Sequence, residues 1–331
     1  MVETQIYPEV VHIGRIIREL RTSAINLTPE TTLETRIEEG IGGGAPITSK
    51  TLSVWGTKTA IIAAIGTGSE SAREELRECG IELVLEEYHV PMDTTITWDM
   101  GEKGKSLTYD ARCSRMLNQE HIRRNSPYIL NSKISVMSTL GGFDISVLEE
   151  TARQFKAASD KGVVTALDLG GYIKNPEYMA IFQELFLPGL RWVFGNEKEI
   201  YWAAKREGEN IESPDKIREF MTPERAVEFA NRILGINNKL ELVNVHYGEG
   251  GTILVRRGKY HHEMPSFRPP VKNNSGPGNV QNAGIIDCFL KGKDDAYAAK
   301  FANAASGLYV GGMGYPKLGQ IESVMKGNFP I

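Results

Sequence analysis

The stretch NNSGPGNVQNAG, at residues 273–284, carries the residues best suited to chemistry in this chain. Two closely spaced glycines, Gly276 and Gly278, precede a run that can form a helix beginning near Val280. Amide N–H groups at a helix start, with the helix dipole behind them, favour a negative charge. A reactive carboxylate usually accompanies such a loop, whereas here the neutral amide of Asn279 stands where an acid is expected. The sequence therefore predicts an anion-binding loop and leaves open whether it catalyses or only binds.

Composition and charge set the class of protein. The chain has 331 residues, of which 41% are apolar and 24% charged, enough for a sizeable core in one large or two small domains. Its net charge of −4 gives no global basic field, so neither nucleic acid nor an anionic membrane is expected as a partner. Cys79, Cys113 and Cys288 stand far apart without a C-x-x-C pair, which favours a reducing compartment over disulfides or a zinc site. With no signal sequence and no apolar run approaching about 18 residues, a cytoplasmic location is expected.

Short β-rich runs alternate with helical patterns along the chain, beginning with a strand near residue 10. The runs expected as later strands are 59–66, 133–138, 163–170, 191–196 and 240–248. The expected helices are 49–56, 69–80, 144–162, 176–186 and 222–235, and a hairpin starts near residue 250. Strand, helix and strand in repetition indicate an α/β domain in three layers, with a mostly parallel central sheet and helices on both faces.

One region interrupts this alternation. Residues 94–110 are typical of two strands around the turn GEKG, and residues 31–40 of another strand beside them. A small antiparallel sheet inserted in an α/β domain predicts a lid over the carboxyl edge of the main sheet, where ligands bind; the alternative is a surface hairpin without a role. We therefore expect one domain over residues 1–331, with lid insertions at 31–40 and 94–110. Unpaired lid edges are often covered by a second subunit, so a homodimer through the lid is a further prediction.

Two motifs in the first two thirds of the chain carry a resemblance to a known family. The segment GGGAPITSKTLSVWGTKTAIIAAIGTG contains the pair Gly43 and Gly44, followed by Thr48, and NEKEI places Asn196 and Glu199 in an N-x-x-E spacing. With the motifs below, they make the chain resemble the PfkB carbohydrate kinases, the ribokinase-like sugar and nucleoside kinases, from about residue 10 to residue 325. The resemblance implies a ribokinase-like fold, ATP as phosphoryl donor, and Mg²⁺ near Asn196 and Glu199. It also implies substrate contacts from Gly43, Gly44 and Thr48, where Thr48 replaces the family's asparagine.

Two later segments, HYGEGGTILVRRGKY and FANAASGLYVGGMG, are similar to the family's nucleotide-binding segments. Gly248 and Gly251 fit the glycines of a T-x-G-x-x-G turn, with His246 in place of its threonine. Asn303 falls in the helix that lies beside the adenine in the family. The resemblance implies that these four residues bind ATP, while ordinary packing is an equal alternative for His246.

The anion loop itself is similar to the family's D-T-T-G-A-G-D segment. Gly276 and Gly278 match its anion-hole glycines, whereas Asn273 replaces an acid, Pro277 an alanine and Asn279 the catalytic base. An asparagine amide can orient a hydroxyl but cannot take its proton. Pro277 has no N–H to donate and is expected to push Gly276 towards an extended conformation. Losing a general base (about 10²- to 10⁴-fold) and one donor (about 10²- to 10³-fold) predicts turnover lower by about 10⁴ to 10⁷.

Further acids and histidines complete the candidate set. Glu19 matches the family's sugar-binding aspartate with one more methylene, and Asp168 ends a buried strand where the family often has an acid; both are assigned to the substrate. Asp287 stands eight residues after the base position, too far along the helix to replace the base. The pair His261–His262 is interpreted as a strand end rather than a metal site.

Two functions therefore remain. The first is a divergent kinase that uses ATP and Mg²⁺ to phosphorylate a hydroxyl of a sugar-like or nucleoside substrate. The second is a catalytically silent member, a pseudokinase, that binds nucleotide, a sugar-like ligand or a protein partner at the same place. The nucleotide and magnesium motifs favour the first function, and Asn279 favours the second.

Overall fold

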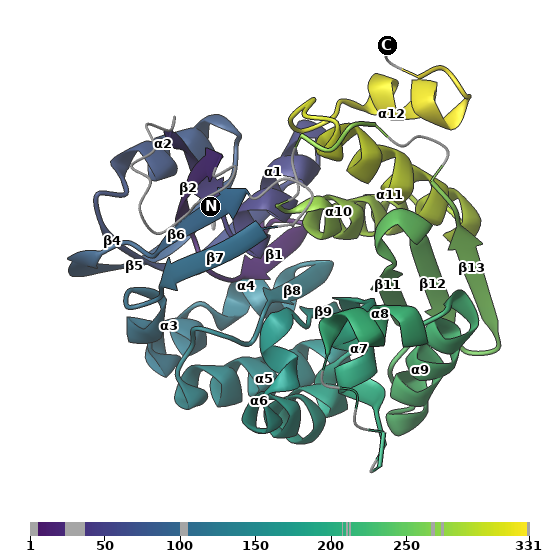
Figure 1. Cartoon of the computed structure of the whole chain (residues 1–331). Coiled ribbons are helices and arrows are strands. Elements are labelled where there is room, and N and C mark those ends of the chain that lie inside the picture. Colours follow the sequence, from purple (N-terminus) through teal and green to yellow (C-terminus); the bar gives the residue numbers. More distant parts are fainter. Residues whose placement is uncertain are drawn as a thin grey trace, which may run out of the picture.

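The computed structural model describes residues 6–23, 37–99, 105–206, 208–209, 211, 213–265, 269–272 and 275–329. A nine-stranded sheet runs through the molecule in the order β13-β12-β11-β10-β9-β8-β1-β4-β5 (Figure 1). The strands from β11 to β5 run parallel, and β12 and β13 join the other edge antiparallel. In chain order they are β1 (Val10–Ile13), β4 (Thr59–Thr67), β5 (Glu82–Pro91), β8 (Ile134–Ser138), β9 (Val164–Asp168), β10 (Trp192–Asn196), β11 (Leu242–His246), β12 (Thr252–Arg256) and β13 (Lys259–Glu263).

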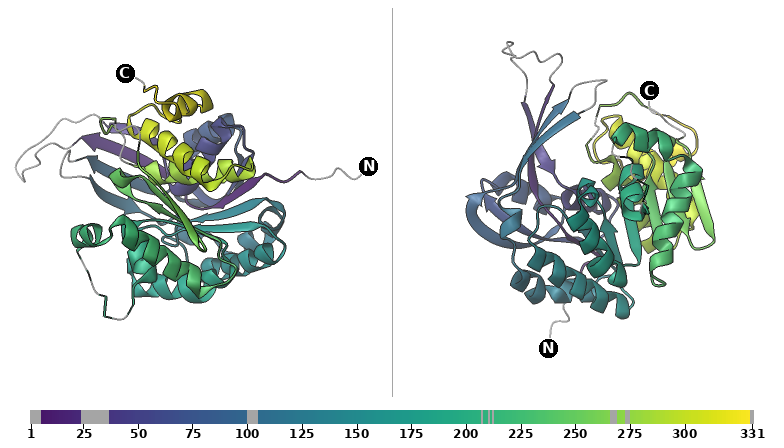
Figure 2. Two further views of the ribbon diagram at one scale, coloured as in Figure 1. Left: turned by 90° about the vertical axis from the view of Figure 1, so that its right-hand side faces the viewer. Right: turned by 60° about the horizontal axis from the view of Figure 1, so that its bottom comes forward.

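Helices cover both faces of this sheet, which confirms the predicted three-layer α/β fold (Figure 2). One layer holds α1 (Gly44–Val54), α2 (Glu70–Glu78), α10 (Pro277–Leu290), α11 (Asp295–Val310) and α12 (Leu318–Met325). The other holds α3 (Gln119–Arg124), α4 (Ser126–Asn131), α5 (Ile145–Asp160), α6 (Pro176–Ala180), α7 (Glu197–Ala204), α8 (Pro214–Phe220) and α9 (Pro223–Ile236). Alternate residues of β1 serve the two layers: Val10 packs in one core, and Val11 and Ile13 in the other. Burial on both faces explains why the strands are near-continuous apolar runs.

Two helix predictions need correction. The helix predicted at 49–56 begins at Gly44, because Gly43, with φ of 98°, turns the chain directly from strand to helix. The helix predicted at 176–186 is α6 followed by a π-helical segment, Ile181–Phe186. Neither change alters the layers.

A second sheet of four strands, in the order β3-β2-β6-β7, stands beside the first, and we call it the lid (Figure 2). Its strands are β2 (Ile17–Ser23), β3 (Ile37–Gly42), β6 (Thr94–Asp99) and β7 (Lys105–Asp110). The two strands predicted within 94–110 are confirmed as the antiparallel pair β6 and β7. Residues 31–36 and 100–104 lie outside the described residues, and 37–40 belong to β3. Strand β2 was missing from the prediction, because the core strand before it has only four residues and the chain passes from one sheet into the other within three residues.

The chain crosses between lid and main sheet at a buried ion pair. Asp93, between β5 and β6, accepts a hydrogen bond from Nε of Arg15, between β1 and β2, at 3.0 Å. The same carboxylate accepts the backbone N–H groups of Cys113 and Ser114, just after β7, at 2.9 and 3.1 Å. The carbonyl of Asp93 accepts the N–H of Arg18 at 2.8 Å. One carboxylate therefore ties three crossings of the chain together.

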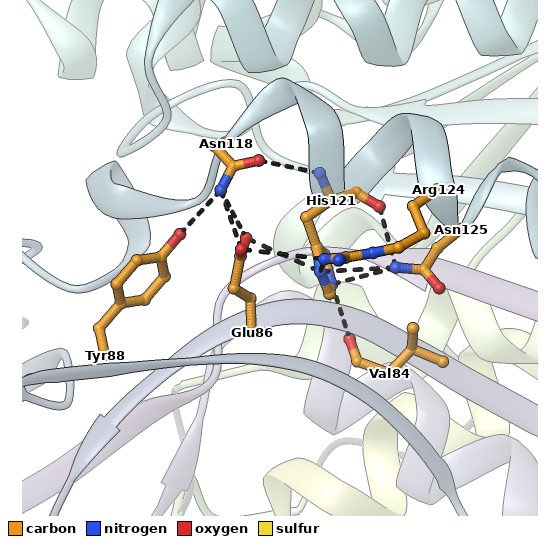
Figure 3. Close-up of polar contacts among 7 residues, drawn as sticks. All are labelled: Val84, Glu86, Tyr88, Asn118, His121, Arg124 and Asn125. Carbon is orange, nitrogen blue, oxygen red and sulfur yellow. Dashed lines mark hydrogen bonds and ion pairs between the residues drawn. The ribbon is translucent and has the colours of Figure 1, made fainter.

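A polar cluster joins β5 to α3, the elements that come before and after the lid strands β6 and β7 in the chain (Figure 3). The amide nitrogen of Asn118, which caps α3, donates to both carboxylate oxygens of Glu86 at 2.9 and 3.0 Å and to the hydroxyl of Tyr88 at 3.3 Å. The amide oxygen of Asn118 accepts the N–H of His121 at 2.9 Å. Burial and the Glu86 carboxylate raise the pKa of Tyr88 to about 12, so its hydroxyl stays protonated. The cluster therefore holds together the two elements that flank β6 and β7 in the chain.

In the part of the chain that the structure describes, no helix combines the length and the apolar character that crossing a membrane requires.

Candidate active site

The predicted anion loop lies at the start of α10, but its local geometry differs from expectation. The helix begins at Pro277, three residues before the predicted start at Val280. Gly276 is left-handed, with φ of 93° and ψ of 1°, so the prediction of an extended conformation was wrong. Without a Cβ, glycine adopts this cap, and the proline then occupies a first helical position where no N–H is needed within the helix. Asn273, the replaced acid of the motif, lies outside the described residues.

Residues from three elements meet at Asn279. A Cβ atom built on Gly44 would lie 3.0 Å from Oδ1 of Asn279 and 3.0 Å from Cβ of Ser138, at the end of β8. The hydroxyl of Thr48 donates to the carbonyl of Asn279 at 3.3 Å. Gly44 of the predicted pair therefore lies beside Asn279, where a larger residue at 44 would be crowded. Thr48 is buried and anchors α10, and Ser138 is a neighbour that the sequence motifs missed.

Glu19 lies in the lid strand β2 and is already hydrogen-bonded. Its carboxylate accepts Nη2 of Arg21 at 2.9 Å and the hydroxyl of Thr97 at 3.0 Å, and Ser275 also hydrogen-bonds it. Burial opposes its ionisation, but the hydrogen bonds and the charge of Arg21 hold the pKa of Glu19 below its ordinary value. The acid that matches the family's sugar ligand is therefore ionised and bonded to protein groups.

A hydrogen-bonded chain joins His246 to Asp168 behind the loop. The ring Nε2 of His246 lies 2.7 Å from Oδ1 of Asn282, and Nδ2 of Asn282 donates to Asp168 at 3.1 Å. With the amide in this orientation, Nε2 carries the proton and Nδ1 is an acceptor. A Cβ on Gly278 would lie 2.8 Å from Nδ1, so the imidazole packs against the loop. Burial lowers the pKa of His246 to about 4, which keeps the ring neutral.

Two partly buried carboxylates lie near each other: Asp168 at the end of β9, and Glu199 in the first turn of α7, just after β10. Burial and the charge of Glu199 raise the pKa of Asp168 well above its ordinary value, and burial raises the pKa of Glu199 to about 7. Asn196 forms a capping box with Glu199: its Oδ1 accepts two N–H groups of α7, and Glu199 accepts the N–H of Asn196 at 2.9 Å. The N-x-x-E spacing thus shapes the helix start and turns Glu199 towards Asp168. Among the described residues, no group of three or more His, Cys, Asp or Glu is arranged to hold a metal ion.

The predicted nucleotide residues form a tight turn over a buried polar network. Gly248 and Gly251 have φ of 49° and 92°, and a Cβ on Gly251 would lie 2.1 Å from the carbonyl oxygen of Glu263. The side chain of Asn303 accepts the hydroxyl of Thr252 at 2.8 Å and donates to the carbonyl of Glu263. Gln281 of α10 donates to the same oxygen of Asn303 at 3.2 Å. Asn303 therefore holds α11, α10 and the hairpin together beneath the glycine turn.

The remaining candidates have structural partners. Asp287 accepts hydrogen bonds from Thr57 at 3.1 Å and Lys291 at 2.8 Å within the α10 layer. A ring nitrogen of His262 lies 2.8 Å from the carbonyl oxygen of Gly250. These contacts place Asp287 in the packing of the α10 layer and His262 against the glycine turn.

Several solved structures with this fold are named as ribokinases or as adenosine kinase. The fold superposes on ribokinase from Giardia lamblia with a TM-score of 0.80 at 15% identity, over 96% of this chain and 99% of that chain. Ribokinase of Arabidopsis thaliana, in complex with ribose and ATP, gives 0.74 at 16% identity over 97% and 99%. Adenosine kinase from Sinorhizobium meliloti gives 0.75 at 17% identity over 98% and 100%. The chain therefore has the ribokinase-like α/β fold.

The sequence matches the pfkB family carbohydrate kinases over residues 8–315. Because the match spans nearly the whole chain, this protein belongs to the pfkB family of carbohydrate kinases. A search of curated proteins gives no match.

Proposed function

We propose that this protein is a slow ATP-dependent kinase that phosphorylates a hydroxyl of a sugar-like or nucleoside substrate. The observation that carries the proposal is the position of Asn279 at the N-terminus of α10, beside the glycine pair of α1. This is the place where a family member holds its base, and here the group is an amide. The fold and the loop support phosphoryl transfer, and the amide limits its rate.

The chemistry follows from what each group can do. Gly276, Gly278 and the helix start present backbone amides to the transferring phosphoryl group, with one donor fewer because of Pro277. Asn279 can orient the acceptor hydroxyl but leaves its proton for solvent or the phosphoryl oxygens. Because phosphoryl transfer depends mainly on positioning and charge stabilisation, slow turnover survives the loss of the base.

The residues present fit Mg²⁺ on one side of the proposed site. Asp168 and Glu199 are partly buried carboxylates whose pKa values are raised by burial and, for Asp168, by the like charge of Glu199, and a divalent cation would relieve both costs. These two acids would hold the ion, directly or through water, whereas the amide oxygen of Asn196 is engaged by helix N–H groups. Bound Mg²⁺ would neutralise charge on the ATP phosphates.

The glycine turn supports ATP as the donor. Gly248 and Gly251 keep the turn tight, and Asn303 holds the hairpin that carries it. The ring of His246 lies between this turn and Gly278, on the proposed path of the phosphates. We assign these residues to the nucleotide, with Asn303 acting through the backbone it positions.

A specific observation favours the silent alternative. Glu19 is bonded to Arg21, Thr97 and Ser275, so the acid that should accept sugar hydroxyls already has three partners. Together with Asn279, this supports a pseudokinase that binds nucleotide, a sugar-like ligand or a protein partner without turnover.

In either case the outer strands β3 and β7 leave lid edges for a second copy, so the homodimer through the lid stays a proposal.

A screen of sugars and nucleosides for ATP consumption tests the proposal. The wild-type protein, Asn279→Asp and Asn231→Asp are assayed in parallel with Mg²⁺. Asn231 is exposed on α9 and gives the same charge change away from the site. We expect weak wild-type turnover on one acceptor, a rise of about 10²- to 10⁴-fold in Asn279→Asp, and no change in the control. No turnover in any of the three proteins would favour the pseudokinase, and wild-type turnover of about 1–100 s⁻¹ would contradict the slow-kinase proposal.

A further inference from the structure

Thr139 has a backbone conformation that its residue type disfavours. Its φ is 84°, and no other non-glycine residue in the described ranges has a positive φ. A β-branched side chain in this region is a genuine outlier, because its Cβ crowds the backbone. A glycine would adopt the same conformation without this strain. Strained residues of this kind cluster where a site requires a fixed geometry.

Contacts from two neighbouring strands hold Thr139 in place. It follows the last residue of β8, and its N–H donates to the carbonyl of Asp168, at the end of β9, at 2.9 Å. Its hydroxyl oxygen accepts the N–H of Gly141 at 3.3 Å. A Cβ on Gly170, which has φ of 65°, would lie 2.5 Å from that hydroxyl oxygen. Thr139 and Gly170, which both have a positive φ, are therefore in contact at the carboxyl edge of the sheet.

The same turn reaches the lid hinge. Gly142, with φ of 89°, packs against the Arg15 side chain, since a Cβ there would lie 3.0 Å from Nε of Arg15. The carbonyl of Gly142 accepts the hydroxyl of Ser114 at 2.9 Å. The turn over residues 139–142 is therefore fixed on one side by β9 and on the other by the groups around Asp93.

The turn sets the position of Ser138, which is next to Asn279 across Gly44. Ser138 Cβ and Asn279 Oδ1 both lie 3.0 Å from the place where a Gly44 Cβ would be. A rotation of the turn at 139 would move Ser138 away from this junction. Because phosphoryl transfer is sensitive to displacements of about 1 Å, such a rotation would misplace an acceptor bound beside Asn279.

We infer that Thr139 is a positioning residue for the phosphoryl acceptor: its strained backbone and its hydroxyl hold the end of β8 so that Ser138 and Asn279 define the acceptor position. This inference rests on the proposed kinase function. It assigns Thr139 to the acceptor, because the position it sets is that of Ser138, which lies next to Asn279 across Gly44. Its own contacts are to the carbonyl of Asp168, to Gly141 and to Gly170, and not to the glycine turn at 248–251.

Three substitutions separate the effect of the backbone strain at residue 139 from the effect of its hydroxyl group. Thr139→Ala keeps the left-handed strain and removes the hydroxyl, Thr139→Gly removes both, and Thr139→Ser keeps the hydroxyl. We expect the ligand-free melting temperature of the glycine variant to exceed that of the alanine variant by about 2 °C or more. For the acceptor that gives the highest turnover in the screen, we expect kcat to fall at least about tenfold in the glycine and alanine variants. We expect KM for ATP to stay within about twofold, and the serine variant to retain kcat within about threefold.

The outcomes distinguish this inference from the function it rests on. An inactive wild-type protein would overturn the kinase proposal and, with it, the role of Thr139. An active wild-type protein whose glycine variant keeps both kcat and the acceptor KM would overturn the role of Thr139 alone. A parallel loss of ATP affinity, without rescue by serine, would indicate a general structural role and would equally overturn it. A glycine variant less stable than the alanine variant would show that the backbone is not strained.

Discussion

The proposed nucleotide side and the proposed acceptor side of this protein keep the residues of the family motifs to different degrees. On the nucleotide side, the glycine turn, Asn196 and Glu199 keep the residue types that the family resemblance predicts, and hydrogen bonds hold them. On the acceptor side, Asn279 stands at the base position and Glu19 is bonded to its own lid. The comparison indicates that groups serving both fold and ligand are retained, whereas a group that serves only chemistry can be exchanged while the fold persists.

The largest expected effect comes from removing the carboxylate of Asp93, at the connections between the lid and the main sheet. Asp93→Ala leaves the buried Arg15 and two backbone N–H groups without their carboxylate, which we expect to lower the free energy of unfolding by about 3–5 kcal/mol. Urea unfolding measures the change. Asp160→Ala, which removes an exposed ion pair with Lys239, is the control and should change the free energy of unfolding far less. Equal effects of the two substitutions would show that the lid hinge carries no special stability.

The next effect concerns the donor that Pro277 removes. In an Asn279→Asp background, Pro277→Ala restores an N–H at the start of α10 and should raise kcat by about 10²- to 10³-fold, provided the amide reaches the phosphoryl group. Steady-state kinetics with saturating ATP give the ratio. Pro223→Ala, at the first position of α9, makes the same exchange away from the site and should leave kcat unchanged. A rise of less than about twofold from Pro277→Ala would mean that this amide faces away from the transferred group.

Ligand stabilisation compares the two sides directly. A nucleotide present at about 100 times its Kd should stabilise the native state by about 2.7 kcal/mol, because it binds the folded chain only. We expect ATP with Mg²⁺ to raise the melting temperature clearly and ribose at the same concentration to raise it less. Stabilisation by ribose without stabilisation by ATP would reverse the comparison.

The smallest expected effect is a pH dependence of stability caused by His12, in strand β1 of the main sheet. Burial lowers the pKa of His12 to about 3, and within the described residues neither ring nitrogen has a hydrogen-bond partner. Because the unfolded chain takes up this proton near pH 6.5 and the folded chain does not, stability is retained above pH 6.5 and falls by about 1.4 kcal/mol per pH unit between 6.5 and 3. Urea unfolding at pH 7 and 5.5 gives the free energy of unfolding of the wild-type protein and of His12→Leu. We expect this free energy to fall less steeply below pH 6.5 in His12→Leu, by about 1.4 kcal/mol per pH unit. Identical slopes would mean that His12 is protonated in the folded state.

The sequence predicted the fold well, because its signals are local. Alternating strand and helix patterns, each with its own glycine stop, indicated the parallel sheet, and the turn GEKG indicated the hairpin at 94–110. Strand β2 was missed because its residues, IRELRTS, lack the apolar run of a core strand. Its partner strand β3 comes from a segment separated from it along the chain.

The site was predictable as a set of positions but not as a set of contacts. Motif order pointed to Asn279, Gly44 and the glycine turn. Because strand β2 was not predicted, the sequence analysis did not place Glu19 and Arg21, two residues apart, on one face of a strand where they bond. The conformation of Gly276 was predicted wrongly, because the rule for residues before proline holds less strictly for a residue without Cβ. Ser138 and Thr139 belong to no motif, and only tertiary packing brings Ser138 close to Asn279, with Thr139 as its neighbour in the chain.

A single-turnover experiment tests the central claim most directly: the nucleotide side still binds, and Asn279 limits the chemistry. Wild-type protein and Asn279→Asp are mixed with saturating ATP, Mg²⁺ and the acceptor found in the screen, and the rate of phosphoryl transfer is measured with the ATP Kd. We predict a rate about 10²- to 10⁴-fold higher in Asn279→Asp, with a Kd for ATP unchanged within about threefold. Equal transfer rates in the two proteins would show that another residue is the base. A Kd that tightens in step with the rate would show that the nucleotide side had changed as well.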